Sequence, residues 1–145
     1  MNSDLTIRPV RAGDEAALAP LLVQLGYAIV AAELAERIAL FADRATDCTL
    51  VAECDGVIVG CIGLHVMDCF HQVLRQGRVA SLVVDERCRG RRIGAALLAA
   101  GEDWLRARGC ARVELTSHGE RRDAARGYQT QGDSHHSLRV VKPRP

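Results

Sequence analysis

The stretch that decides the fold is SLVVDERCRGRRIGAALL, which runs from Ser81 to Leu98. An apolar, β-branched run comes first, a short basic loop with glycine follows, and apolar residues then recur at helical spacing. This order predicts a strand, a loop and the beginning of a helix. The first amides of a helix have no partner within it and the helix dipole is positive there, so the loop predicts a site for an anion.

The composition of this loop supports the same prediction. Gly90 and Gly94 leave room for a ligand to approach the backbone, which a larger side chain would obstruct. The net charge of the chain is only +1, so attraction for an anion has to come from a local arrangement. The glycine patterns of dinucleotide-binding and Walker loops are absent from the sequence. The cations that surround the predicted site are Arg87, Arg89, Arg91 and Arg92.

Outward from this stretch, hydrophobic periodicity predicts a succession of strands and helices. Asp55 and Gly56 separate two apolar, β-branched runs and predict a hairpin. Gly109 predicts the end of the longest helix, and Pro20 predicts a kink or a later start in the first one. The predicted strands are 5–8, 49–54, 57–67, 79–84, 111–116 and 137–141, the predicted helices are 13–26, 31–44, 92–108 and a weakly patterned 123–129, and 70–76 is a polar connection.

Length and composition predict one compact domain that covers residues 1–145. Of these residues 48% are hydrophobic and 26% are charged, which is ordinary for a globular protein with a real core. The order of the predicted elements is that of a mixed α/β fold. The run 57–67 is apolar on both faces, so we expect it near the centre of a covered sheet.

The sequence predicts a cytoplasmic protein without a metal site. Its first residues, MNSDLTIRPV, lack the basic region and apolar run of a signal peptide, and no apolar stretch is long enough to span a bilayer. The six cysteines form no CxxC pair, so we expect reduced thiols rather than a zinc site or a disulfide framework. Adjacent His135 and His136 would point to opposite faces of a strand, which favours exposure to solvent over metal binding.

The segment from Ser81 to Leu98 resembles the acetyl-coenzyme A signature of the GNAT superfamily of N-acetyltransferases. That signature has Gln or Arg, two residues, Gly, one residue and then Gly or Ala, after a strand that ends in an acidic residue. Arg89 and Gly94 match its first and last positions, and Arg92 stands where glycine is usual. DLTIRP, VAECDGVIVGCIGL, RARGC and VELTS are also similar to the family. The resemblance implies a single-domain α/β fold with a mostly antiparallel central sheet flanked by helices.

The resemblance also implies roles for individual residues. The backbone of the strand before the loop would pair with the pantetheine arm, and an N–H of Val83 or a neighbour would polarise the thioester carbonyl. Amides of the loop and the first helical turn would hold the pyrophosphate. Tyr128, in AARGYQTQGD, stands where the family has a tyrosine that protonates the leaving thiolate. The implied coenzyme A-binding residues are Leu82, Val83, Val84, Arg89, Gly90, Arg91, Arg92, Ile93, Gly94 and Ala95.

The group that accepts the proton of the amine is left open by the sequence. Relatives often have glutamate just before the SLVV run, where this chain has Ala80. Gly127, Gln131 and Asp133 stand where apolar or aromatic residues are usual, which predicts loose packing of the C-terminal part. The remaining candidates for the base are His65, Glu114, His118, a water relay, or a substrate that arrives already neutral.

Three functions are compatible with these patterns. The resemblance favours transfer of an acetyl group from acetyl-coenzyme A to a primary amine of a small molecule or peptide, and homodimers are common in the family. Ala80 and the altered C-terminal segment suggest instead a coenzyme A-binding or regulatory domain without turnover. A nucleic-acid-binding domain would use the arginines of the loop. The near-neutral net charge and the 3% of aromatic residues argue against it.

Overall fold

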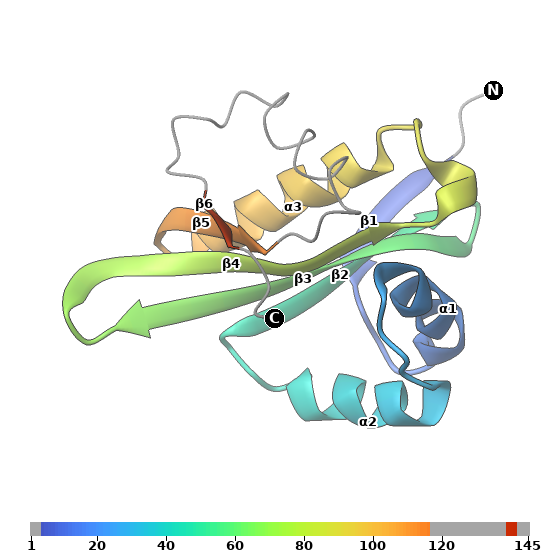
Figure 1. Cartoon of the computed structure of the whole chain (residues 1–145), viewed down its shortest axis with the longest axis horizontal. Coiled ribbons are helices and arrows are strands. Elements are labelled where there is room, and N and C mark those ends of the chain that lie inside the picture. The colour runs from blue at the N-terminus through green and yellow to red at the C-terminus, as the bar shows by residue number, and fades with distance from the viewer. Residues whose placement is uncertain (1–3, 117–138, 142–145) are drawn as a thin grey trace.

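A computed structural model describes residues 4–116 and 139–141 of the chain (Figure 1). The predicted helix 123–129 and Tyr128 lie outside these described residues. The elements are, in chain order, β1 (Leu5–Pro9), α1 (Glu15–Leu25), α2 (Ala31–Phe41), β2 (Asp47–Cys54), β3 (Val57–Cys69), β4 (Gln72–Val84), the 3₁₀-helix η1 (Glu86–Cys88), α3 (Ile93–Ala107), β5 (Cys110–Thr116) and β6 (Arg139–Val141).

The strands form one sheet in the order β1-β2-β3-β4-β5-β6. Each strand from β1 to β4 is antiparallel to the next, whereas β5 is parallel to β4 and β6 is parallel to β5. Two parallel strands need a crossover connection, and between β4 and β5 this connection is α3, which lies on one face of the sheet (Figure 1). The predicted α/β class, with a mostly antiparallel central sheet flanked by helices, is confirmed. The extent of the domain over residues 1–145 stays a prediction.

The turn between β2 and β3 is formed by Asp55 and Gly56, as predicted. Both residues have positive φ, 52° for Asp55 and 81° for Gly56. A two-residue hairpin turn of type I′ requires positive φ at both residues, which Asp tolerates and Gly adopts freely. The two residues from which the hairpin was predicted therefore form its turn.

The hairpin of β3 and β4 corrects the predicted polar connection 70–76. β3 continues to Cys69 and β4 begins at Gln72, so most of that segment is strand. β2 begins with Asp47 opposite His65, and β5 pairs with β4 only from Arg75, so the end of the hairpin projects beyond the sheet (Figure 1). Side chains on a projecting ribbon need no alternation of apolar and polar residues. For this reason the pattern did not predict a strand.

Two helix predictions also need correction at their ends. α1 passes through Pro20, so the later start is wrong, and the missing N–H of proline removes one hydrogen bond. α2 ends at Phe41 rather than at 44, and the guanidinium of Arg44 lies 4.2 Å from the centre of the Phe41 ring. Gly26 and Gly109 follow α1 and α3 in the left-handed conformation, as expected of helix-ending glycines.

Two apolar clusters cover the two faces of the sheet. The cluster under α3 includes Ile62, Leu97 and Leu105, which are all fully buried. The cluster on the other face, under α1 and α2, includes Leu21 and Val51. The central strands therefore contribute to both clusters, which explains why the run 57–67 is apolar on both faces.

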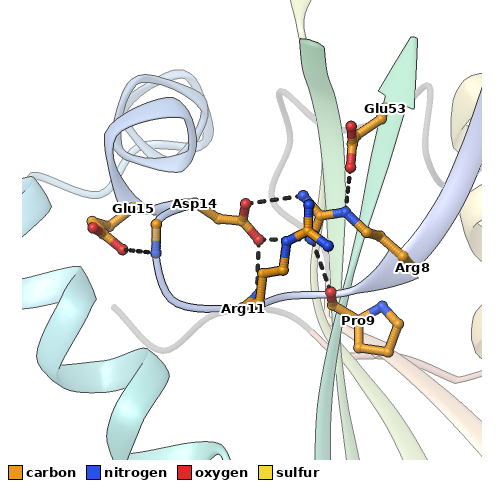
Figure 2. A network of polar contacts seen from close by, with 7 residues as sticks. Arg8, Pro9, Arg11, Asp14, Glu15 and Glu53 are labelled. Atoms are coloured by element: carbon orange, nitrogen blue, oxygen red, sulfur yellow. Dashed lines mark hydrogen bonds and ion pairs between the residues drawn. The ribbon is translucent and has the colours of Figure 1, made fainter. Parts of the chain in front are cut away.

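Arg8 of β1 joins three elements of the fold (Figure 2). Its guanidinium donates to both carboxylate oxygens of Asp14 at 2.9 Å and also to Glu53 on β2. The buried Asp14 additionally accepts from the backbone amide of Arg11 at 2.8 Å. The hydrogen bonds from Arg8 lower the pKa of Asp14 below its ordinary value. These contacts fix the start of α1 against the edge of the sheet.

The lowered pKa of Asp14 predicts a loss of stability in acid. Such a carboxyl group stabilises the fold above its ordinary pKa of about 4, and this contribution is lost as pH falls through the lower pKa of the folded chain. We expect Asp14→Asn to lower the free energy of unfolding by about 2 kcal/mol at neutral pH. The difference from the wild type should narrow as the pH is lowered.

Urea unfolding over a series of pH values measures this difference. Asp103→Asn is the control, because it removes an exposed ion pair with Arg106 on α3. A deficit of Asp14→Asn that stayed constant down to strongly acidic pH would contradict the role given to its charge.

Candidate functional site

The candidate site begins where β4 and β5 separate. Their pairing ends at Val79 and Leu115. At the same level the register between β3 and β4 shifts, so that Ala80 is an extra residue between the pairs formed by Val79 and Ser81. Such a bulge bends the strand and increases its twist. The last part of β4 is thereby turned away from β5.

Leu82, Val83 and Val84 lie on this last part of β4. No strand of the described chain pairs with the edge of β4 that faces the opening. The side chains of Leu82 and Val83 are buried in the clusters on opposite faces, which leaves the backbone as the accessible part. An open strand edge can hydrogen-bond an extended ligand that carries amides.

Asp85 fixes the beginning of the loop that follows β4. Its buried carboxylate accepts from the backbone amide of Arg87 at 3.1 Å and from the Arg87 guanidinium at 2.9 Å. Its own amide donates to the carbonyl of Val59 on β3 at 2.7 Å. The hydrogen bonds from the Arg87 side chain and backbone lower the pKa of Asp85 to about 2. Asp85 is therefore ionised at neutral pH and neutralises Arg87.

Gln24 connects α1 to the same loop. Its side-chain oxygen accepts from the backbone amide of Glu86 at 3.0 Å, and its nitrogen lies 3.5 Å from the Asp85 carboxylate. Sequence reasoning missed Gln24, because it is an exposed polar position on an amphipathic helix. Nothing in the local pattern indicates a contact with a residue 62 positions away.

The beginning of α3 presents amides that the helix does not use. The first hydrogen bond of the helix joins the amide of Ala96 to the carbonyl of Arg92. The amides of Arg92, Ile93 and Gly94 have no acceptor within the described part of the chain. A Cβ added to Gly94 would meet only Val84 Cγ2, at 3.6 Å. Packing within the protein therefore does not require glycine there, and the missing side chain leaves room for a ligand to approach the backbone.

The backbone of Arg92 explains why glycine is usual at this position of the signature. Its φ of 63° and ψ of 21° are left-handed. This conformation costs a residue with a side chain about 1 kcal/mol or more. The side chain is exposed and the amide remains available, so the substitution preserves the donor that the signature requires.

We expect Arg92→Gly to raise the free energy of unfolding by about 0.5–1 kcal/mol. Relief of the left-handed strain should exceed the extra entropy that glycine gives the unfolded chain. Arg91→Gly is the matched control and should be destabilising, because Arg91 is not among the residues with positive φ. Urea denaturation measures both, and a less stable Arg92→Gly variant would contradict the assignment of strain.

Three arginines give the start of α3 a local excess of positive charge. Arg89, Arg91 and Arg92 are exposed and form no ion pair with another described residue. Arg87 is held by Asp85, so three of the four predicted cations remain available. Guanidinium groups beside open amides favour a ligand with several negative charges, such as one with phosphates.

His65 lies on the face of the sheet opposite to α3. Leu64 and Val66, on either side of it, belong to the cluster under α3, so alternation along β3 places His65 on the face of α1 and α2. Its Nδ1 is 2.9 Å from Asp47 Oδ1, and the imidazole side chain is 40% exposed. Sequence reasoning named His65 but missed Asp47, because the pairing of β2 with β3 alone brings the two together.

Of the other candidate catalytic groups, Glu114 alone lies among the described residues. Glu114 lies on β5 opposite Arg78 of β4. His118 and Tyr128 lie outside the described residues, and so do Gly127, Gln131 and Asp133. Roles assigned to these residues stay predictions.

The described residues include no group of three His, Cys, Asp or Glu side chains that could hold a metal ion. All six cysteines are free, and burial raises the pKa of the Cys61 thiol to about 12. Within the described ranges, every helix is too short or too polar to cross a membrane.

The sequence profile of the family described as "Acetyltransferase (GNAT) family" matches residues 20–132 of the chain. The chain belongs to the GNAT family. The resemblance of Ser81 to Leu98 to this family is thus confirmed. Both parts of the site, the open edge of β4 and the start of α3, lie within the matched residues.

Two curated relatives of this GNAT protein are named, one as an N-acetyltransferase and the other as an acetyltransferase. An aminoalkylphosphonate N-acetyltransferase of Salmonella typhimurium is 36% identical over 88 residues, which are 61% of this chain and 57% of the relative. A mycothiol acetyltransferase of Sanguibacter keddieii is 39% identical over 97 residues, which are 66% of this chain and 31% of the relative. The chain thus spans little more than half of the first relative and about a third of the second.

A solved structure shows the same fold. It is an aminoglycoside N-acetyltransferase in complex with CoA, with a TM-score of 0.80 and 18% identity. The comparison covers 100% of this chain and 97% of that one. At this identity the likeness establishes the fold of this GNAT protein.

Proposed function

We propose that this protein is an acetyl-CoA-dependent N-acetyltransferase that acts in the cytoplasm on a primary amine of a small molecule or peptide. The observation that carries the proposal is the position of two donor sets around one loop. The open edge of β4, residues 80–84, lies before the loop, and the unpaired amides of Arg92, Ile93 and Gly94 lie after it. A pyrophosphate joined to an extended, amide-bearing arm fits both sets at once, and acetyl-CoA is such a molecule.

In this proposal each part of the site has a separate role. The backbone of Leu82, Val83 and Val84 pairs with the pantetheine arm, and an N–H of Val83 or a neighbour polarises the thioester carbonyl. The amides from Arg89 to Ala95 hold the pyrophosphate, and the unpaired arginines neutralise its charge. Transfer forms the C–N bond and breaks the C–S bond, and Tyr128 supplies a proton to the departing thiolate.

The proposal is tested by ligand binding and by release of free thiol. We expect acetyl-CoA at millimolar concentration to raise the melting temperature, because a ligand that binds only the folded state stabilises it. Free thiol should accumulate with at least one member of an amine panel. The panel includes 2-aminoethylphosphonate, because the name of one relative suggests this class of acceptor. Absence of any thermal shift would contradict the proposal.

A second candidate is a coenzyme A-binding domain without turnover. Ala80 favours it, because the bulge lacks the carboxylate that relatives often carry at this position. A thermal shift with acetyl-CoA, together with no thiol release for any amine of the panel, would support this candidate over the enzyme.

A further inference from the structure

We propose that His65, oriented by Asp47, accepts the proton of the acceptor amine. This inference rests on the acetyl transfer proposed above and names the base of that reaction. At neutral pH a primary amine is an ammonium ion and cannot attack a carbonyl until it has lost a proton. The site therefore needs a proton acceptor close to the opening between β4 and β5.

The end of β4 itself offers no such group. From Val79 to Val84 its side chains are VASLVV, and none of them accepts a proton at neutral pH. Arg78, the residue before this run, is a cation. The base must therefore come from a neighbouring strand, from the part of the chain outside the described residues, or from water.

His65 is the neighbouring group with suitable chemistry. It lies directly opposite Arg78 in the pairing of β3 with β4, two positions along the strand from Ala80. The two residues along β4 span about 7 Å and the step across to β3 adds about 5 Å, a separation that the imidazole side chain, one water molecule and the amine can bridge. The cofactor cradle at α3 lies on the other face. An arm laid along the open edge of β4 would bring its end through the opening toward His65.

Asp47 sets the orientation and the tautomer of this imidazole. Its Oδ1 lies 2.9 Å from Nδ1 of His65, and its Oδ2 accepts from the Thr46 hydroxyl at 2.9 Å. A carboxylate in this position favours the proton on Nδ1 and leaves the lone pair on Nε2. The Asp47 side chain is 15% exposed and the His65 side chain 40%, so the carboxylate is sheltered while the imidazole remains accessible.

Charged groups on three strands lie around His65. Among the described residues they are Asp47 on β2, Arg78 on β4 and, one strand further, Glu114 on β5. Asp47 stabilises the imidazolium once it forms, as the carboxylate does in a catalytic triad.

The proton balance of the step is complete. His65 Nε2 takes one proton from the ammonium group, and the neutral amine attacks the thioester carbonyl. The C–N bond forms, the C–S bond breaks, and the second proton shed by nitrogen replaces the one that Tyr128 gives to the thiolate. His65 then returns its proton to water. The overall products are the amide, the free thiol and one proton.

The test compares His65→Gln with His71→Gln in the full chain. His71 lies exposed at the turn of the β3–β4 hairpin, so its replacement is a matched control. The substrates are acetyl-CoA and 2-aminoethylphosphonate, or the panel amine that the wild type acetylates fastest. We expect kcat/KM of His65→Gln to fall about 100-fold or more at neutral pH, and that of His71→Gln to remain unchanged. The thermal shift with acetyl-CoA should be the same in both variants.

The pH profile separates a base from a structural residue. The deficit of His65→Gln should shrink as the pH approaches the pKa of the amine, because the amine then arrives neutral. Asp47→Asn should lose roughly tenfold in kcat/KM, and ¹⁵N NMR should show the His65 proton shifting from Nδ1 toward Nε2.

Each outcome decides the inference. Full activity of His65→Gln, or a deficit that is the same at all pH values, would overturn the role of His65 and leave the acetyltransferase proposal intact. Absence of turnover by the wild type with every amine, despite binding of acetyl-CoA, would overturn the proposed function together with this inference.

Discussion

Gly94→Trp is expected to abolish the rise in melting temperature that acetyl-CoA produces. The indole would occupy the space beside the first amides of α3, which is now open except for Val84 Cγ2 at 3.6 Å from an added Cβ. Loss of the pyrophosphate contacts should weaken binding by more than about 100-fold, or about 2.7 kcal/mol. The fold itself should tolerate the change, because φ of Gly94 is not positive.

Isothermal titration calorimetry and thermal shift measure this effect. Ala99→Trp is the matched control, since it places the same indole on an exposed position of α3 away from the loop. Both variants should melt near the wild-type temperature without ligand, and only the control should respond to acetyl-CoA. Wild-type affinity in Gly94→Trp would show that the ligand does not approach the start of α3.

The second large effect is expected from Leu105→Ala, which should lower the free energy of unfolding by about 2–5 kcal/mol. Leu105 is fully buried in the cluster between α3 and the sheet. Gly77 of β4 lies directly beneath it, and a Cβ added there would lie 2.8 Å from Leu105 Cδ2. The close approach of α3 to β4 therefore depends on Leu105 on the helix and on Gly77, which has no side chain, on the strand.

A double-mutant cycle tests this complementarity. Gly77→Ala alone should destabilise by about 1–3 kcal/mol through overpacking, and less in the background of Leu105→Ala, because the new methyl group enters the vacated space. Leu40→Ala, at a half-exposed position of α2, is the control and should cost much less. Strictly additive losses in urea unfolding would mean that the two positions do not share this contact.

Local chemistry explains which parts of the fold could be predicted. Asp55 and Gly56 adopt the positive φ that their residue types tolerate best, so their pair predicted the hairpin turn. The strand, loop and helix from Ser81 to Leu98 formed as expected because their apolar periodicity and glycines act within a few residues. The left-handed Gly109, just beyond the end of α3, has the same local origin.

The failures occurred where the environment of a segment depends on distant residues. The strand residues within 70–76 are exposed on a projecting ribbon, so apolar and polar side chains do not alternate along them. Pro20 is accommodated within α1, because packing of the helix on the sheet outweighs one missing hydrogen bond. Neither fact can be read from the neighbouring residues.

The sequence by itself determined the class of fold, the strand–loop–helix that predicts an anion site, and the family. These properties depend on residue types and short spacings. Only the tertiary structure decided that Gln24 holds the loop, that β4 separates from β5 at Ala80, and that Asp47 meets His65. Those contacts join residues from different elements, and the register of a sheet, which places such residues side by side, is set by the packing of the whole chain.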